Sequence, residues 1–406
     1  MKLYDTIVIG AGAAGLFYGA LSEPGTDSLI IDHSERSGLK LLISGSGQCN
    51  ITHDGSIKDF ITRYGQNGRY IRSALYGANN LSLVEFLNKN GIKTVTRDDG
   101  KIFPESLKAS EILNMLIKKS EANGFPLLLK EHITDISSDD SDGTYIVKTE
   151  NSSFKTKKLV IAAGGMSYPK TGSDGSLYPL IEKLGIQMIP ARPALVPIYT
   201  HSYGYRNLSG ISFKAVLVRL LENNREIAAQ TGDILLTHRA FSGPAILDIS
   251  RYADKGHKLE INYIYPVTGQ RAADMIKADF QGNSRELHTY ISRIFKIPDA
   301  FAVKLIENAG ICPYMKTSCT EGDEITKIAE ALPCHRYAVS GTGSFSEAMV
   351  TAGGVSLDEV NLRNMESKKH SNLFFIGEVL DIDGDTGGFN LQFAYSSAMA
   401  AVKNKK

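Results

Sequence analysis

The fold is decided by residues 4–15, YDTIVIGAGAAG, in which a short apolar run leads into glycines spaced G-x-G-x-x-G. The apolar run is brief and rich in β-branched residues, which is typical of a strand buried in a parallel sheet. The small residues after it predict a helix packed closely on that strand. A second apolar run, Ser28–Ile31, ends at Asp32, about 20 residues beyond the second glycine. These segments together predict one β-α-β unit.

Each glycine of this motif has a separate physical purpose. Gly10 permits a tight turn, Gly12 lets the backbone approach a pyrophosphate, and Gly15 lets the helix lie close to the sheet. The free N–H groups at the start of the helix would then face phosphates. Asp32 is placed to accept hydrogen bonds from a ribose hydroxyl. The motif therefore predicts a dinucleotide site, and its alternative is a glycine-rich turn without a ligand.

Two further stretches favour FAD over NAD as the dinucleotide. Short extended segments at Ile133–Ile136, Thr144–Thr149 and Ser153–Thr156 predict a small meander that feeds an apolar strand at Leu159–Ala163, which Gly164 and Gly165 follow. This order is expected in FAD-binding folds of the glutathione-reductase type. A second glycine-rich turn, Gly384–Gly388, precedes a helical pattern at Phe389–Ala401. The N–H groups at the start of that helix would stabilise a reduced flavin ring and raise its potential.

The pattern of the chain changes beyond about Pro190. Strand-like runs follow at Lys214–Leu221 and Gly232–Thr237, and Arg271–Gly310 is richer in helical pattern. The chain is expected to return to the first domain near Ala352–Val355. We therefore predict a domain boundary near Pro190 and a helical insertion in the second domain.

Composition limits the classes of function. Hydrophobic residues make up 42% and charged residues 22%, and 45 basic against 44 acidic side chains leave a net charge of +1. This balance is typical of a globular protein and gives no electrostatic case for nucleic acid. We expect a small-molecule substrate and no nucleic-acid partner. The chain shows no N-terminal leader pattern and no apolar run of about 18 residues, so we expect a cytoplasmic protein without a membrane segment.

The four cysteines predict neither a disulfide framework nor a metal site. Cys49, Cys312, Cys319 and Cys334 are scattered, and none lies in a Cys-x-x-Cys pair. Cys334 precedes His335, but the other spacings match no zinc pattern. We expect no metal.

Four separated stretches carry a resemblance to a known family. Gly38–Asn50 (GLKLLISGSGQCN), Thr231–Ser250, Thr351–Val355 and Phe375–Leu391 (FIGEVLDIDGDTGGFNL) resemble the hallmarks of the BaiN/YhiN-like (HI0933-like) flavoprotein family. The resemblance extends from residue 1 to about residue 400. It implies noncovalent FAD in a two-part Rossmann-like domain, a β-barrel-like second domain and a small helical insertion.

The expected fold class is therefore α/β, with a Rossmann-like FAD-binding domain of the glutathione-reductase type. The domains are expected at residues 1–190 plus 346–406 (FAD-binding), 191–266 plus 318–345 (β-barrel-like) and 267–317 (helical). One residue departs from the family pattern, because Gln48 stands where the family usually has a basic residue before Cys-Asn. An amide can exchange neutral hydrogen bonds but cannot neutralise an anion.

The motifs and the resemblance give one set of cofactor-binding candidates. They are Gly10, Gly12, Ala13, Ala14, Gly15, Asp32, His33, Lys40, Leu41, Ser44, Gly45, Gly47, Gln48, Cys49, Asn50, Ile133, Ala163, Gly164, Gly165, Gly377, Glu378, Asp385, Gly388, Phe389, Asn390 and Leu391. Among the polar contacts, Glu378 and Asn390 are the first choices. Asp381 and Asp383 complete an acidic loop for which flavin contact is preferred to metal binding.

Catalytic residues are harder to assign from the sequence. Cys49 lies where disulfide reductases carry a dithiol, but a relay needs two sulfurs, so a packed residue lining the flavin site is preferred. His238 is a weak acid or base candidate, since a turn leading through Ser242 to a helix at Pro244 explains its motif without catalysis. Tyr168 and Tyr395 border the cofactor in one interpretation and belong to the core in the other.

The leading functional hypothesis is an FAD-dependent oxidoreductase that transfers a hydride through noncovalent flavin. The resemblance implies a reductase of an unsaturated or carbonyl substrate, with NAD(P)H as a transient electron donor. Gly341–Gly343 lacks a third glycine, so no separate NAD(P)H domain is expected. The alternatives are an O₂-dependent oxidase of a small amine and a tRNA-associated flavoprotein, the latter disfavoured by the near-neutral charge.

Overall fold

The computed structural model describes residues 1–139, 142–280 and 284–403. The backbone contacts group the chain into two units, residues 1–194 with 348–406 and residues 195–347. Each unit has its own apolar core. The three-part domain ranges stay a prediction, whereas the predicted α/β fold class is confirmed.

The first unit is built on a mixed sheet in the order β18-β19-β20-β9-β1-β2-β6. Its centre is parallel: β9 pairs with both β1 and β20, and β2 pairs with β1 and β6. Strands β7 and β8 extend β9 as an antiparallel meander. The strands are β1 (Leu3–Ile9), β2 (Ser28–Ile31), β6 (Leu127–Leu128), β7 (Ile133–Asp139), β8 (Thr144–Thr149), β9 (Ser153–Ile161), β18 (Val360–Asn361), β19 (Glu366–Ser367) and β20 (Leu373–Phe375).

Strand β9 joins two segments that the sequence pattern separates. Its first half, expected as the last meander strand at 153–156, pairs with β8, and its apolar second half pairs with β20. Both halves pair with β1, from Leu3↔Lys155 to Ile9↔Ile161. One continuous strand thus links the meander to the parallel sheet and ends beside the glycine-rich turn.

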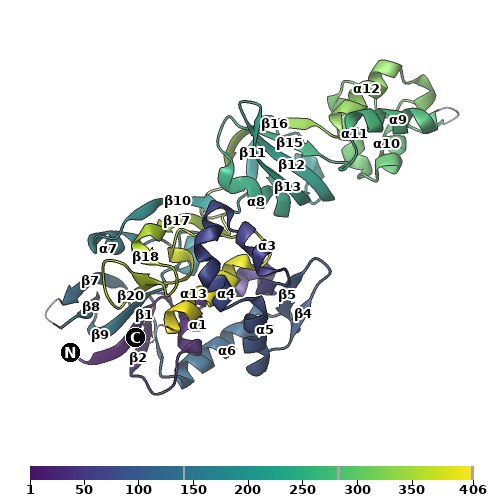
Figure 1. Ribbon diagram of the computed structural model, residues 1–406. Helices are drawn as coiled ribbons and strands as arrows, with labels where there is room; N and C mark the ends of the chain where they lie inside the picture. Colours follow the sequence, from purple (N-terminus) through teal and green to yellow (C-terminus); the bar gives the residue numbers. More distant parts are fainter. Residues whose placement is uncertain (140–141, 281–283, 404–406) are drawn as a thin grey trace. The chain divides into compact units, whose positions relative to one another are not determined.

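Two helices pack against helix α1 (Figure 1). Helix α1 (Ala13–Leu21) contacts both α13 (Phe389–Val402) and α6 (Ala109–Ala122). Residues 14–20 of α1 are all buried, because the helix is covered on every side. The unit also contains α2 (Leu39–Ile43), α3 (Ile57–Thr62), α4 (Arg72–Gly77), α5 (Asn80–Lys89), α7 (Tyr178–Lys183), β3 (Thr52–His53), β4 (Thr94–Thr96), β5 (Lys101–Pro104), β10 (Met188–Ala194) and β17 (Val350–Val355).

The second unit contains a closed six-strand antiparallel barrel in the order β11-β14-β13-β12-β15-β16. The predicted strand-like runs lie in its two longest strands, which are joined through Asn223 and Asn224. Both asparagines have positive φ, 49° and 62°, as tight hairpin turns require. The strands are β11 (Ile198–Thr200), β12 (Ser212–Glu222), β13 (Arg225–Leu236), β14 (Phe241–Ser242), β15 (Lys258–Asn262) and β16 (His335–Thr342), and helix α8 (Pro244–Ile249) follows β14.

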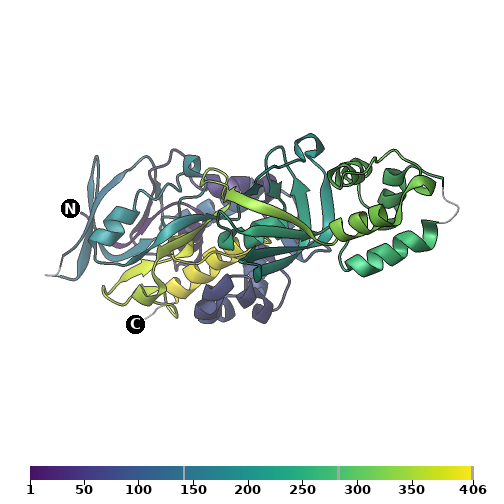
Figure 2. The same ribbon diagram turned by 90° about the horizontal axis from the view of Figure 1, so that it is seen from above.

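Four helices gather on one side of this barrel (Figure 1, Figure 2). They are α9 (Gly269–Phe280), α10 (Leu287–Phe295), α11 (Asp299–Asn308) and α12 (Gly322–Ala331). Helix α12 falls in the range 318–345, which the sequence analysis assigned to the barrel. A capping box between Glu321 and Glu324 marks the start of this helix. This pair is visible in the sequence and indicates a helix start there.

Aromatic side chains join the barrel to these helices. Phe301 of α11 lies 4.6 Å, between ring centroids, from both Phe213 and Tyr263. The Tyr337 hydroxyl is 2.7 Å from the hydroxyls of Tyr205 and Tyr263, and all three tyrosines are buried. Such a network satisfies three hydroxyls where water cannot reach them.

No helix among the described residues combines the length and the apolar character needed to cross a bilayer.

The tyrosine network predicts a measurable loss of stability in the variant Tyr337→Phe. Removing the central hydroxyl leaves those of Tyr205 and Tyr263 without their shared partner, so we expect the free energy of unfolding to fall by about 1–3 kcal/mol. Urea unfolding followed by tyrosine fluorescence measures it, since the chain has no tryptophan. Tyr314→Phe, at a 59% exposed position, is the matched control. Equal stability of the two variants would contradict the network's role.

Candidate cofactor and active site

The three glycines of the first turn differ in what surrounds them. A Cβ on Gly10, which has φ of +108°, would lie 2.3 Å from the Ala162 carbonyl oxygen, and one on Gly15 would lie 1.9 Å from the Gly10 oxygen. A Cβ on Gly12 would meet no atom within 4 Å. Gly10 and Gly15 therefore serve backbone packing, while Gly12 borders open space where a diphosphate fits.

The first turn of helix α1 faces that space, and no side chain caps its backbone N–H groups. It has no side-chain cap at Gly12 and no acidic residue in its first turn. The positive end of the helix thus suits a ligand's phosphates. At the end of β2, Asp32 accepts the N–H groups of Ala11 at 2.6 Å and Ser34 at 2.7 Å. These bonds fix the carboxylate and leave lone pairs for ribose hydroxyls.

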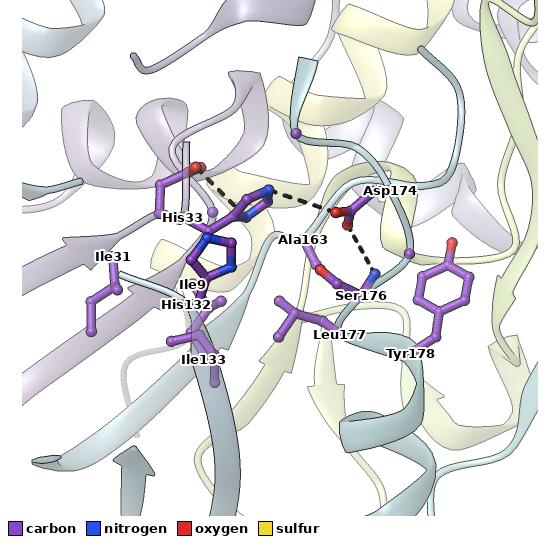
Figure 3. A pocket seen from close by; sticks show the side chains of 14 residues that line it. Ile9, Ile31, His33, His132, Ile133, Ala163, Asp174, Ser176, Leu177 and Tyr178 are labelled. Atoms are coloured by element: carbon purple, nitrogen blue, oxygen red, sulfur yellow. Dashed lines mark hydrogen bonds and ion pairs between the residues drawn. The ribbon is translucent and has the colours of Figure 1, made fainter. Parts of the chain in front are cut away.

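A pocket opens at the ends of these strands (Figure 3). The lining includes the predicted residues Gly10, Asp32, His33, Ile133 and Ala163, which come from separate segments of the chain. Figure 3 shows the His33 ring directed at Asp174, with 3.9 Å between Nε2 and the carboxylate. The pocket has the donors and acceptors of an adenosine site.

The sequence analysis missed two contributors to this pocket. His132 lies beside His33, with 5.3 Å between the ring centroids. The segment 174–178 closes the other side, and its last residue, Tyr178, has a buried hydroxyl with no hydrogen-bond partner among the described residues. Burial raises the pKa of Tyr178, and the charges of Glu378 and Asp381 add to that shift. A neutral, unpaired donor here suits a ligand oxygen.

The second glycine-rich turn forms the start of α13. Gly388, with φ of +92°, precedes the helix, which has no side-chain cap and no acidic residue in its first turn. A Cβ on Gly388 would lie 2.7 Å from the Thr52 backbone, so only glycine fits. In the amide orientation that satisfies its neighbours, Asn50 accepts the Gly388 N–H at 3.2 Å. This contact joins the stretch at 44–50 to the second turn.

Asn390 makes two side-chain hydrogen bonds within its own turn, and its flavin contact stays a prediction. Its side-chain oxygen accepts the Gly384 N–H, and its amide donates to the Gly384 oxygen, both at 2.8 Å. Asn390 thus closes the turn on itself. Tyr64, which is fully buried, donates its hydroxyl to the Phe389 carbonyl at 2.7 Å and fixes the first turn of α13.

Lys40 and Glu378, predicted as cofactor contacts, form a partly buried ion pair. The Lys40 Nζ lies 2.7 and 2.9 Å from the two Glu378 oxygens. Glu378 also accepts the Thr351 N–H at 2.9 Å and the Ser167 hydroxyl at 3.0 Å. The Thr351 hydroxyl accepts N–H groups of Met166 and Ser167. Four distant segments are held together by this carboxylate.

Cys49 and Gln48 lie in a turn of unusual backbone. Cys49 is fully buried with φ of +60°, and burial raises its thiol pKa to about 12, opposed by a hydrogen bond with Ser44. Such a thiol stays protonated and suits packing. The Gln48 oxygen accepts Arg97 Nη2 at 2.7 Å, and that guanidinium lies 3.9 Å above the Phe103 ring. Arg97, between β4 and β5, therefore supplies a positive charge next to Gln48, whose own amide is uncharged.

The other single-residue hypotheses have separate outcomes. His238 lies exposed in a turn closed by Thr237, and α8 begins at Pro244 as expected, although its cap is Gly243 and not Ser242. A catalytic role for His238 stays a prediction. Tyr395 is buried, 5.5 Å from Phe17 between ring centroids, which supports the core interpretation.

The remaining candidates lie close to these contacts. A Cβ on Gly377 would meet Ala14 at 2.6 Å, and one on Gly165 would meet Thr351 at 2.3 Å. Asp385 contacts Arg63, with 3.8 Å between carboxylate and guanidinium. Along the same segments lie Ala13, Leu41, Gly45, Gly47, Gly164, Leu391, Tyr168 and Asp383. In the described ranges, no three His, Cys, Asp or Glu side chains converge as a metal site.

The open space at Gly12 predicts a variant that separates FAD binding from folding. Gly12 has φ of −80° and ψ of −171°, which valine adopts freely. Gly12→Val should therefore leave the melting temperature of the FAD-free protein unchanged and weaken FAD binding at least about tenfold, or about 1.4 kcal/mol. Flavin-fluorescence titration and thermal unfolding measure both.

The matched control for that variant is Gly15→Ala, whose new Cβ meets backbone. It should lower the melting temperature itself. FAD binding of Gly12→Val at wild-type strength would show that the diphosphate lies elsewhere.

The raised pKa of Cys49 predicts an unreactive thiol. Because the pKa lies above its ordinary value, the thiolate is scarce at pH 8, and iodoacetamide should label the exposed Cys312 and Cys319 but not Cys49. Peptide mapping by mass spectrometry measures this labelling. Cys49→Ala should keep flavin binding and its reduction by a chemical reductant. Rapid labelling of Cys49 in the folded protein would contradict the packing role.

Comparison with known proteins agrees with this geometry. The model of the HI0933-like protein Rossmann domain matches residues 4–404. The ribosomal RNA dihydrouridine synthase of Escherichia coli (strain K12) is 30% identical over 408 residues, covering 100% of this chain and 98% of that protein. The 3-dehydro-bile acid delta(4,6)-reductase of Clostridium scindens is 25% identical over 408 residues, covering 97% of each.

Among solved structures, the 3-ketosteroid-delta4-(5alpha)-dehydrogenase from Rhodococcus jostii RHA1 has a TM-score of 0.51 at 12% identity, covering 99% of this chain and 97% of that one. This likeness shows the fold alone. The family match extends over both units and includes the glycine turn Gly10–Gly15, Asp32 and the start of α13. The chain belongs to the HI0933-like family and is an FAD-dependent oxidoreductase with a Rossmann-type FAD-binding fold.

Proposed function

We propose that this enzyme reduces a carbon–carbon double bond conjugated with a carbonyl, and that its substrate is a uracil base within an RNA. The observation that carries the proposal is the match to the E. coli ribosomal RNA dihydrouridine synthase over the whole chain, at 30% identity. Dihydrouridine differs from uridine by saturation of the C5=C6 bond, which is conjugated with the C4 carbonyl.

The second relative supports the same chemistry on another substrate. A 3-dehydro-bile acid with delta-4,6 double bonds is likewise a ketone conjugated with carbon–carbon double bonds. Reduction in both cases adds a hydride to a carbon that the carbonyl makes electrophilic. The lower identity of this relative, 25% against 30%, favours uracil over a steroid.

The residues of the first unit suit FAD in this role. Gly10–Gly15 would hold the diphosphate, Asp32 the ribose, and the first turn of α13 the flavin ring, where its free N–H groups favour negative charge. Bound FAD supplies hydride transfer. Tyr64 and Asn390 keep that turn of α13 rigid, and the Lys40–Glu378 pair holds the surrounding segments. The buried thiol of Cys49 supplies no redox partner.

NAD(P)H is the proposed electron donor, visiting the flavin transiently. Gly341–Gly343 was the other candidate for a dinucleotide turn, but its first two residues end barrel strand β16, and the next element is strand β17 and not a helix. A cytoplasmic location would give the enzyme both NAD(P)H and RNA. An RNA substrate departs from our expectation of no nucleic-acid partner, which rested on the charge of the whole chain.

The proposal is tested by anaerobic reduction followed by product analysis. We expect NADPH or NADH to bleach the bound flavin, and unmodified ribosomal RNA transcript to reoxidise it with formation of dihydrouridine, detected by nucleoside mass spectrometry. Gly12→Val is the matched control and should form no product without added FAD.

Two outcomes would contradict the proposal. In one, the reduced enzyme leaves every uridine of the transcript unchanged but reduces a steroid enone. In the other, the enzyme releases peroxide with a small amine, which would favour the oxidase alternative.

A further inference from the structure

The segment 57–76 is basic and carries four aromatic side chains, whereas the chain as a whole has a net charge of only +1. It contains Lys58, Arg63, Arg69 and Arg72 against one acid, Asp59, while acidic side chains outnumber basic ones in the remainder of the chain. Asp59 faces its own helix start, where its carboxylate accepts the Ser56 hydroxyl at 2.7 Å. The segment itself therefore carries a net charge of +3, four basic side chains against one acid, although Arg63 faces Asp385 with 3.8 Å between their charged groups.

The aromatic residues of this segment divide into a buried and an exposed pair. Phe60 and Tyr64 are each 1% exposed and belong to the core. Tyr70 and Tyr76 are 43% and 49% exposed. Part of each ring therefore remains accessible to a ligand, while the Arg69 guanidinium lies over the Tyr70 ring.

Arg69 and Tyr70 form a prepared stacking unit. The guanidinium lies 4.7 Å from the centroid of the Tyr70 ring, and Arg69 Nη2 donates to the Tyr70 hydroxyl at 2.8 Å. Both groups are planar and both are exposed at the surface. Stacked arginine and tyrosine planes are the surfaces on which unpaired bases rest in single-stranded RNA complexes, and nearby arginines pair with the phosphates.

The same segment borders the start of α13. The Arg63 carbonyl accepts the Asp385 N–H at 2.8 Å, and its guanidinium lies 5.9 Å over the Phe389 ring. Asn67 donates to the Asp381 carbonyl at 2.8 Å. Helix α4 packs on α13 (Figure 1), where Ser396 donates to the Ala78 oxygen. The segment is thus in contact with the loop before α13 and with α13 itself, where the proposed function puts the flavin ring.

We propose that the surface formed by Arg69, Tyr70, Arg72 and Tyr76 binds the single-stranded RNA that flanks the target uridine. The inference rests on the proposed function, because it gives that reaction its docking surface. The arginines hold phosphates and the tyrosines stack on bases. A duplex is a poorer fit, since its bases are already stacked and unavailable to the tyrosines.

The test compares two double variants in the full-length FAD-bound protein, using a fluorescein-labelled single-stranded uridine-rich RNA. Arg69→Gln with Arg72→Gln should weaken binding about tenfold or more and reduce the slope of log K against log salt by about 1.4, or 0.7 per lost phosphate contact. Tyr70→Ser with Tyr76→Ser should weaken binding about tenfold at an unchanged slope. Lys118→Gln with Lys119→Gln, on α6, is the matched control.

Flavin reduction by NADPH should proceed at the wild-type rate in all three, which shows that they fold. Either test variant binding as tightly as the control would overturn the proposal, as would a preference of the surface for anionic phosphatidylglycerol vesicles over RNA. Failure of the proposed function has a different signature: the wild type binds RNA through these residues but forms no dihydrouridine.

Discussion

The close approach of two backbone segments at Gly10 and Gly15 is the constraint on which the rest of the first unit depends. The Gly10 oxygen occupies the space that a side chain at residue 15 would need, so α1 can rest directly on β1. That position directs the uncapped start of α1 toward the open space at Gly12. The proposed phosphate contacts would therefore follow from packing, because packing alone fixes the amides that would hold the ligand.

The start of helix α13 is likewise an uncapped turn held by its surroundings, and side chains take part in holding it. The start of α13 is fixed by the Tyr64 hydroxyl, by the Asn50 amide and by a turn that Asn390 closes. None of these side chains needs a charge. At the proposed flavin end, the start of α13 would therefore contribute a backbone dipole that costs no reorganisation when charge develops in the reaction.

The predictability of the site follows the range of the interactions that build it. The glycine turns, Asp32 and the meander could be predicted because each depends on neighbours within a few residues. The bond from Lys40 to Glu378 spans 338 positions and that from Arg97 to Gln48 spans 49, and no local pattern signals either. The two hydrogen bonds of the Asn390 side chain to Gly384 were likewise not predicted from the sequence, although they span only six positions.

The net charge of the whole chain is a poor guide to the molecules that it binds. A net charge of +1 averages the cationic segment at 57–76 with an acidic excess elsewhere, although screening limits each exposed charge to a range of about 10 Å. At that range a ligand near Arg69 senses its immediate neighbours and not the sum. The same holds at Gln48. Its amide carries no charge, but it accepts a hydrogen bond from Arg97, whose guanidinium lies over the Phe103 ring. The electrostatics of this enzyme are therefore set by which side chains the fold brings together, and the sequence position of a charge is a poor guide to where it acts.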